Sequence, residues 1–237
     1  MDAMLKLTAL LPWADWAALV WFFGAWFGYA TFARRRSLVK PSVLAATSRI
    51  RHQWMLQVTQ REVRIVDGSI VQTLANSPSF FASTTILIIG GLLAVLGTTE
   101  KATELVREIP FAAQTPLLVF DFKLLVLTGI FVYTFFRFTW SIRQYTFGAM
   151  MVGAAPDARE FAADASLSRE DFARRAGRVL SLAAETFNDG LRGYYLAFAA
   201  MGWFISPLVF ALATVGVIFV LYRREFRSDV LEMLRGA

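Results

Sequence analysis

The residues Ser79-Phe-Phe-Ala-Ser-Thr-Thr-Ile-Leu-Ile-Ile-Gly-Gly-Leu-Leu-Ala-Val-Leu-Gly97 belong to a segment, Gly68 to Thr99, that contains no Asp, Glu, Lys or Arg. A helix needs about 20 mostly apolar residues to cross about 30 Å of hydrocarbon. Residues 78–97 supply such a run, with Ser77 in position to cap the helix and Pro78 at its first turn. The sequence therefore predicts a membrane span over residues 78–97.

The small and polar residues of this span gather on one helical face. Ser79, Ser83, Gly90, Ala94 and Gly97 follow one another at spacings of four, seven, four and three residues, which a period of 3.6 places together. In lipid such a face favours close approach of helices and hydroxyl hydrogen bonds between them. Two interpretations follow: a packing seam between helices, or a hydroxyl-lined conduit at the axis of an oligomer.

The composition is typical of a small integral membrane protein. The chain has 237 residues, of which 57% are hydrophobic, and a mean hydropathy of +0.51. Because it has no cysteine and only one histidine, His52, disulfides, thiolate metal sites and histidine-rich catalytic arrangements are excluded. No cofactor is expected. The net charge of +6 favours contact with anionic lipid headgroups over binding of nucleic acid.

Three further apolar runs lead to an all-α prediction. Spans are predicted over about residues 14–33, 116–140 and 194–222. The last is long enough to be tilted, kinked or broken at Pro207, which cannot donate to the carbonyl of Trp203. The predicted fold class is an integral membrane helical bundle with four transmembrane segments and two cytosolic amphipathic helical regions.

The cytosolic helical regions are predicted over about residues 42–77 and 168–190, within a single transmembrane domain. Both carry apolar residues at helical spacing, with basic residues elsewhere. The string Ser168-Arg-Glu-Asp171 resembles a capping box at the start of the second region. Gly190 and Gly193 are predicted to loosen the chain where it returns to the membrane.

Charged residues interrupt the third predicted span. Lys123 and Arg137 are separated by 13 uncharged residues, about 20 Å at 1.5 Å per residue, and lie within about 40° of one helical face. Ionisable groups inside a span are candidates for function, and basic positions on either side of an apolar constriction can form an anion path. The alternative is that Lys123 and Arg137 extend to headgroups while Asp121 interacts favourably with the helix dipole.

The distribution of Lys and Arg predicts the orientation. With four complete crossings, residues 34–77 and 141–193 carry 15 of these residues on one side, against seven on the other. Because the richer side is cytoplasmic, the N-terminus is predicted outside and both amphipathic regions inside. The arginines after Tyr222 then lie outside, a conflict that a re-entrant hairpin at Pro207 would remove.

Five strings distributed along the chain have a common resemblance. They are Arg64-Ile-Val-Asp67, Ser79-Phe-Phe-Ala-Ser-Thr-Thr-Ile-Leu-Ile-Ile-Gly-Gly-Leu-Leu-Ala94, Phe135-Phe-Arg-Phe-Thr-Trp-Ser-Ile-Arg-Gln-Tyr145, Phe187-Asn-Asp-Gly-Leu-Arg-Gly-Tyr-Tyr195 and Leu221-Tyr-Arg-Arg-Glu-Phe-Arg-Ser228. Together they resemble the domain of unknown function 599 family of bacterial and plant membrane proteins, over nearly the whole chain. The resemblance implies a membrane protein with four spans, and it implies no activity and no catalytic residue.

The leading functional hypothesis is a homo-oligomeric channel or transporter-like protein of the bacterial inner membrane, with an anion-favouring path between subunits. Four helices cannot enclose both a dry core and a pore, so the path has to form between copies. The residues expected to line it are Ser79, Ser83, Thr84, Lys123 and Arg137. The residues expected to bind anions or lipid headgroups at its inner mouth are Arg61, Arg64 and Arg192.

Two other classes of function are compatible with the sequence. A membrane enzyme acting on a lipid or amphipathic substrate at the cytosolic interface would use Glu185, Asp189 and His52 as acid or base, and Arg192 to hold a phosphate. A non-catalytic scaffold would use its amphipathic helices to bind lipid or protein partners. No motif assigns a catalytic or metal-binding residue. The expected partners are membrane lipids with anionic headgroups, further copies of the chain and a small anion.

Overall fold

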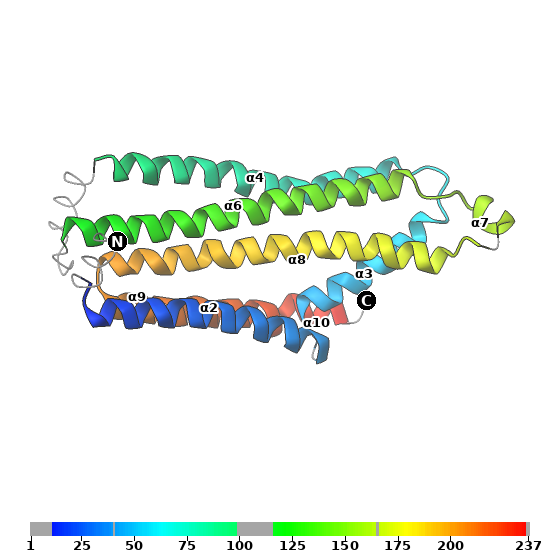
Figure 1. Cartoon of the computed structure of the whole chain (residues 1–237). Helices are drawn as coiled ribbons and strands as arrows, with labels where there is room; N and C mark the ends of the chain where they lie inside the picture. The colour runs from blue at the N-terminus through cyan, green and yellow to red at the C-terminus, as the bar shows by residue number, and fades with distance from the viewer. Residues whose placement is uncertain (1–10, 40, 99–115, 165, 236–237) are drawn as a thin grey trace. The chain divides into compact units, whose positions relative to one another are not determined.

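Helices make up almost all of the chain that the computed structural model describes, which comprises residues 11–39, 41–98, 116–164 and 166–235 (Figure 1). The elements are α2 (Trp13–Val39), α3 (Val43–Val58), α4 (Ile65–Leu96), α6 (Leu117–Gly153), α7 (Glu160–Ala163), α8 (Arg169–Met201), the 3-10 helix η1 (Gly202–Phe204), α9 (Pro207–Phe226) and α10 (Asp229–Arg235). These residues contain no β-strand. The segment between the predicted spans 78–97 and 116–140 falls largely on residues 99–115, which lie outside the described ranges.

Four stretches of helix are long and apolar enough to cross a membrane. They are Trp13–Ser37, Ile65–Leu96, Leu117–Gly153 and Pro207–Leu234. With the amphipathic helices α3 and α8, they confirm the predicted fold class, an all-α integral membrane bundle with four membrane-spanning segments.

The helix that contains the second span is longer than predicted. Ser77 does not cap it, because α4 begins at Ile65 and continues through Pro78. An internal proline removes one hydrogen bond and crowds the preceding turn, yet membrane helices tolerate it where neighbouring groups compensate. Pro78 is buried against the rest of its unit. The predicted helix start at Ser77 is therefore wrong.

The chain divides into two units by its internal packing. Among the described residues, unit 1 contains 11–35, 84–98, 116–134 and 191–223, and unit 2 contains the remainder. Helices α4, α6 and α8 each contribute one segment to each unit. The two units are described separately below.

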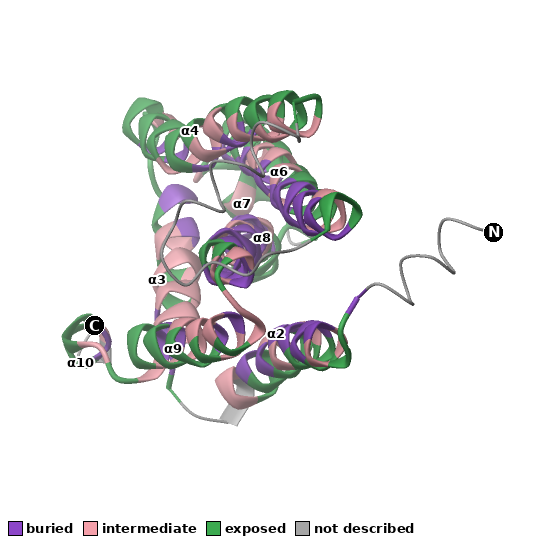
Figure 2. Ribbon diagram, turned by 90° about the vertical axis from the view of Figure 1, so that its left-hand side faces the viewer, coloured by how far each residue is buried: buried purple, intermediate pink, exposed green. Residues whose placement is uncertain are grey.

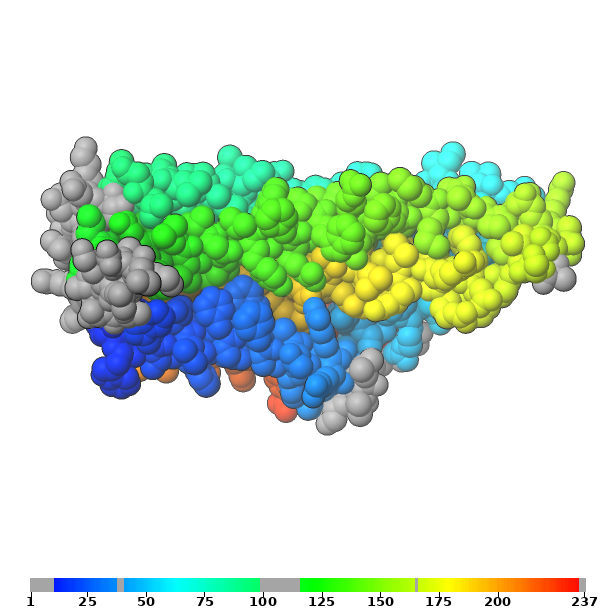
Figure 3. Space-filling model, in the orientation of Figure 1, coloured from blue at the N-terminus to red at the C-terminus, as the bar shows by residue number. Residues whose placement is uncertain are grey.

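In unit 1, α2 runs in the same direction as its segments of α6 and α9. Four aromatic pairs fix these directions: Trp16–Phe122 and Trp26–Tyr133 between α2 and α6, and Phe22–Phe210 and Phe32–Tyr222 between α2 and α9. The side chains of α2 (blue) lie against those of α6 (green) in Figure 3. The α8 segment runs the other way, because Trp203 contacts Asp15 and Arg192 contacts Tyr29.

Residues 194–222, the fourth predicted span, are divided between two helices. Helix α8 ends at Met201, η1 follows, and α9 begins at Pro207 and runs back along unit 1 (Figure 1). Proline is favourable at the first position of a helix, where its missing N–H is not needed. Since Pro207 cannot donate to the carbonyl of Trp203, that oxygen is available to another donor.

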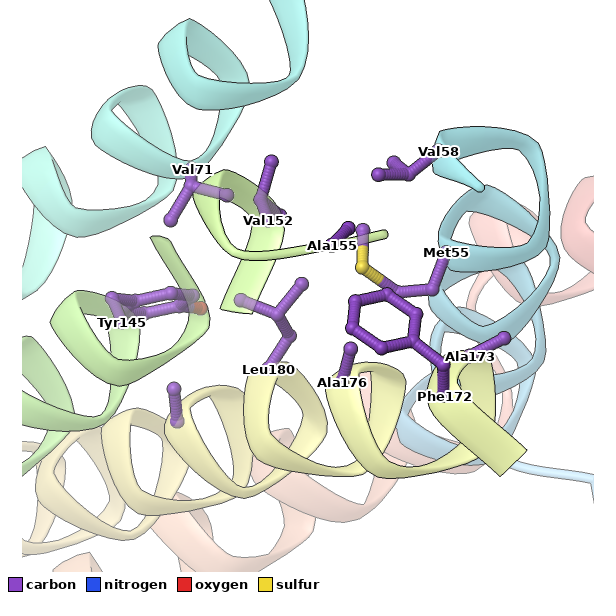
Figure 4. Close-up of a cluster of buried hydrophobic side chains, with 11 residues drawn as sticks. Met55, Val58, Val71, Tyr145, Val152, Ala155, Phe172, Ala173, Ala176 and Leu180 are labelled. Atoms are coloured by element: carbon purple, nitrogen blue, oxygen red, sulfur yellow. The ribbon is translucent and has the colours of Figure 1, made fainter. Parts of the chain in front are cut away.

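Unit 2 is organised around a core between α3, α4, α6 and α8 (Figure 4). Its buried side chains come from all four helices and the loop after α6: Met55, Val58, Val71, Tyr145, Val152, Ala155, Phe172, Ala173, Ala176, Leu180 and Ala183. Caps fix two helix starts, because the Ser42 and Ser168 hydroxyls accept hydrogen bonds from the backbone N–H groups of Ala45 and Asp171. The second cap confirms the predicted capping role of Ser168.

Gly190 and Gly193 lie inside α8 and do not loosen the chain, contrary to the prediction. Both allow close packing instead. A Cβ atom on Gly190 would lie 2.6 Å from Cε1 of Phe138, and one on Gly193 would lie 2.6 Å from Cγ2 of Thr134. Absence of a side chain therefore permits α6 to approach α8 at these positions.

We predict that Gly190→Ala destabilises the protein. The new methyl group would overlap the fully buried ring of Phe138, and overpacking of this kind costs about 1–3 kcal/mol, more than the gain of up to about 1 kcal/mol in helix propensity. Thermal unfolding in detergent measures the change. Gly129→Ala is the matched control, because Gly129 is exposed on α6 with no atom within 4 Å of its Cβ position. Equal melting temperatures for the two variants would contradict the prediction.

Candidate functional site

Lys123 lies in a buried ionic cluster of unit 1. Its Nζ donates a 2.9 Å hydrogen bond to the carbonyl oxygen of Trp203 and lies 3.4 Å from Oδ1 of Asp15. The indole Nε1 of Trp203 donates to the same Asp15 oxygen at 2.6 Å, and the ammonium group lies 5.3 Å from the Trp203 ring centroid. Lys123 is 1% exposed and Asp15 is 4% exposed. The cluster joins α2, α6 and η1.

Pro207 explains why Lys123 occupies this position. The Trp203 carbonyl has lost its helical donor, and a buried carbonyl without a partner is costly. The ammonium group supplies the donor, while Asp15 balances its charge. An ionised group in a dry, apolar bundle is stable only with such compensation. Lys123 thus interacts with α2 and η1 rather than with the hydroxyl groups of α4.

Arg137 is also paired with a carboxylate, in unit 2. Its Nη2 donates to Oδ2 of Asp189 on α8 at 2.5 Å. The Arg137 side chain is 27% exposed and that of Asp189 is 8% exposed. On the same pair of helices, the Ser141 hydroxyl donates to the carbonyl of Ala183 at 2.8 Å. Both predicted basic residues of the third span therefore have acidic partners.

Arg61 and Arg64 hold the loop between α3 and α4. The fully buried carboxylate of Asp67 accepts hydrogen bonds from Nη1 of Arg61 and from Nε1 of Trp54. Arg64 donates to three carbonyl oxygens, those of Val58, Ala155 and Pro156. Most of the donors of Arg64 are thus used within the unit.

Arg192 is buried in unit 1. It is 7% exposed, and its guanidinium carbon lies 5.8 Å from the ring centroid of Tyr29 on α2. This contact is a cation–π interaction between α8 and α2. Arg192 is therefore not presented at the surface, where an anion from solution would meet it directly.

The predicted hydroxyl residues of α4 differ in their surroundings. Ser79 is half-buried, and its hydroxyl donates to the Ala75 carbonyl of the same helix at 2.8 Å. Thr84 is half-buried, whereas Ser83 is exposed. Figure 2 shows α4 exposed along one side, in contrast to the largely buried α8.

The exposed side of α4 follows a regular repeat. Exposed residues recur at alternating spacings of four and three along the helix and just past its end: Ser69, Thr73, Asn76, Phe80, Ser83, Leu87, Gly90, Ala94 and Gly97. Asn76 and Ser83 have no hydrogen-bond partner for their side chains among the described residues. A spacing of 3.5 residues is that of helices that pack along a shared seam.

The acid and base candidates of the enzyme hypothesis are separated into three side-chain pairs in unit 2. His52 pairs with Glu170, Arg178 with Glu185, and Arg137 with Asp189. Burial lowers the pKa of Arg51, the neighbour of His52, while charge interactions oppose that change. No group of three or more His, Cys, Asp or Glu residues that could hold a metal occurs among the described residues.

Sequence reasoning did not find the partners of these residues. Asp15 falls at the edge of the predicted span 14–33, and Trp203 stands out in the sequence only because Pro207 leaves its carbonyl without a donor. The Trp203 carbonyl is the signal in the sequence that points to a partner for a buried cation, because it requires a hydrogen-bond donor from elsewhere in the bundle. Asn76 precedes the predicted span 78–97, so the sequence does not place it on the α4 face.

Comparison with models of protein families gives a match over most of the chain. A family model described as "Protein of unknown function, DUF599" matches residues 17–230. No curated protein and no solved structure matches the chain. Because the match covers nearly the whole chain and agrees with the resemblance of its sequence strings, this protein belongs to the DUF599 family.

Proposed function

We propose that this protein forms a homo-oligomeric channel in the bacterial inner membrane, with α4 helices from several copies facing one another. The path for small hydrophilic ions runs between the copies, along the exposed side of α4. Within unit 1, aromatic and aliphatic side chains of the described residues fill the interior, which favours a path between copies over one through this unit.

The observation that carries the proposal is the exposed repeat on α4. The side chains of Asn76 and Ser83 have no hydrogen-bond partner within the part of the chain that the structure describes, and in lipid such polar groups favour contact with another helix or with water. Gly90 has no atom within 4 Å of its Cβ position, so a second helix can approach closely there. The alternating spacing of four and three residues keeps such a contact in register along the helix.

The charges of the bundle do not line this path. Lys123 and Arg137 are each paired with a carboxylate, so they supply little net positive potential. Thr73, Asn76 and Ser83 supply neutral hydroxyl and amide groups instead. The path therefore distinguishes weakly between anions and cations, and the anion preference inferred from Lys123 and Arg137 is replaced by weak selectivity.

The directions of the unit 1 helices support a proposed orientation in the membrane. Since α9 runs parallel to α2, Arg223 and Arg35 lie at the same end of unit 1. Residues 34–77, 141–193 and 223–235 then share one side and contain 19 Lys and Arg, against three in the segments on the other side. We assign the richer side to the cytoplasm, with the N-terminus outside.

Cysteine cross-linking tests the contact between α4 helices. The natural chain has no cysteine, so Ser83→Cys introduces a single thiol. We expect oxidation in native membranes to give disulfide-linked dimers of Ser83→Cys and of Gly90→Cys. Val220→Cys is the control, because Val220 is 62% exposed but lies on α9. If Ser83→Cys stays monomeric, or if Val220→Cys cross-links equally well, α4 is not the contact surface.

Liposome flux tests conduction. We expect purified protein to pass chloride and potassium at rates within about tenfold of each other, because the proposed lining is neutral. A charged thiol reagent should reduce the flux through Ser83→Cys and leave that through Ala82→Cys unchanged, since Ala82 is only 6% exposed. If the cross-linked oligomers pass neither ion, the protein forms an oligomer but not a channel.

A further inference from the structure

A groove lies between α2 and α9 on the membrane-spanning part of unit 1. Its volume is about 590 Å³, and the side chains around it are almost entirely apolar. Those that shape it are Trp21, Gly28 and Phe32 on α2, and Val215, Phe219 and Tyr222 on α9. Trp21 and Phe219 are 49% and 59% exposed, so the groove opens to the surroundings of the bundle.

Gly28 is the residue that keeps the groove open. No atom lies within 4 Å of the position that its Cβ would occupy. The floor is Tyr29, whose ring packs over the guanidinium of Arg192. Gly28 therefore forms part of the wall of the groove, and the ring of Tyr29 forms its floor. No side chain of the described residues fills it.

The length of the groove corresponds to one lipid leaflet. Trp21 and Phe32 are eleven residues apart on α2, which is about 16 Å at 1.5 Å per residue. The hydrocarbon of a bilayer is about 30 Å thick, so one leaflet contributes about half of that. An extended acyl chain of one leaflet fits this length and this apolar lining.

Two arginines lie next to one end of the groove, where Phe32 packs against Tyr222. On α2 the lining positions 21, 25, 28 and 32 follow a spacing of four, three and four, and the next position of that face is Arg35. On α9, Arg223 directly follows Tyr222. Both arginines are exposed and belong to unit 1. The order from apolar wall to tyrosine to arginine follows that of a phospholipid from acyl chain to glycerol to phosphate.

We propose that this groove binds an anionic phospholipid, with an acyl chain between α2 and α9 and the phosphate at Arg35 and Arg223. A second copy of the protein is a poorer occupant, because a two-fold contact would bring the same arginines of both copies together. The assignment of this lipid to the cytoplasmic leaflet rests on the orientation proposed above. The site itself does not depend on the channel.

Native mass spectrometry of delipidated full-length protein tests the site. Phosphatidylglycerol and phosphatidylcholine are added in equal amounts, and the lipid adducts that survive activation are compared. We expect phosphatidylglycerol to be retained about tenfold better by the wild type, since each arginine near the headgroup favours an anionic lipid. Arg35→Gln combined with Arg223→Gln should remove that preference, whereas Arg49→Gln, which removes an exposed arginine on α3, should not.

A glycine pair provides the steric control. Gly28→Leu fills the groove and should lower retention of both lipids about tenfold. Gly24→Leu, at an equally open position of α2 that does not line the groove, should leave it unchanged. Full retention by Gly28→Leu, or equal retention of the two lipids by the wild type, would overturn the proposal. A change in oligomer mass with Gly28→Leu, without a change in lipid, would mean that a second copy occupies the groove.

Discussion

Lys123→Met is expected to lower the free energy of unfolding by about 3–5 kcal/mol, the usual cost of removing one partner from a buried ion pair. The substitution leaves the carboxylate of Asp15, which is 4% exposed, without a cation. It also leaves the Trp203 carbonyl without its donor. Unfolding of the purified protein by titration with a denaturing detergent measures the change.

The double variant Asp15→Asn with Lys123→Met isolates the charge. The asparagine side chain in place of Asp15 can still accept the hydrogen bond from Nε1 of Trp203, and the buried negative charge is gone. We expect the double variant to recover most of the loss, because neutral replacements of a buried pair are often tolerated. Leu125→Met is the control on the exposed side of α6. A Lys123→Met protein as stable as this control would show that the pair does not form.

Leu180→Ala should cost about 2–5 kcal/mol. Leu180 is fully buried in the core of unit 2, and removing three carbon atoms there leaves a cavity (Figure 4). Its neighbour Gly148 provides a test of the geometry, since a Cβ on Gly148 would lie 2.3 Å from Cδ2 of Leu180. Thermal unfolding of the variants in detergent measures the loss.

Gly148→Ala should have opposite effects in the two backgrounds. In the wild type the added methyl group overlaps Leu180 and destabilises the core. In the Leu180→Ala protein it occupies part of the vacated space, so the double variant should be more stable than Leu180→Ala alone. Equal destabilisation by Gly148→Ala in both backgrounds would mean that the two residues do not pack together.

The spans and the helical class could be predicted because apolar runs of sufficient length have few alternatives in a chain of this composition. The start of α4 could not be predicted from the sequence. Pro78 with a preceding serine is typical of a helix N-terminus, but the apolar surroundings of a bundle can compensate for one missing hydrogen bond. The break before Pro207 could be predicted, because a proline has no N–H to donate to the preceding turn of a helix.

The partners of the charged residues could not be predicted. Lys123 and Arg137 are visible as charges in an apolar run, but their pairing depends on contacts between residues far apart in the sequence. Arg137 and Asp189 are separated by 52 positions, and Trp203 and Asp15 by 188. Helical periodicity specifies which face a residue occupies and does not specify which helix meets that face.

The wide sequence separation of the Asp15, Lys123 and Trp203 cluster also sets an order for biogenesis. Trp203 lies 80 positions after Lys123 in the chain, so a ribosome synthesises and delivers α2 and α6 to the translocation machinery before the indole exists. During that interval Asp15 and Lys123 are already present in the chain, whereas the indole N–H and the carbonyl of Trp203 are still missing from the cluster. Emergence of α8, η1 and α9 then completes the cluster, so correct placement of the break between α8 and α9 is coupled to the position of Asp15 on α2.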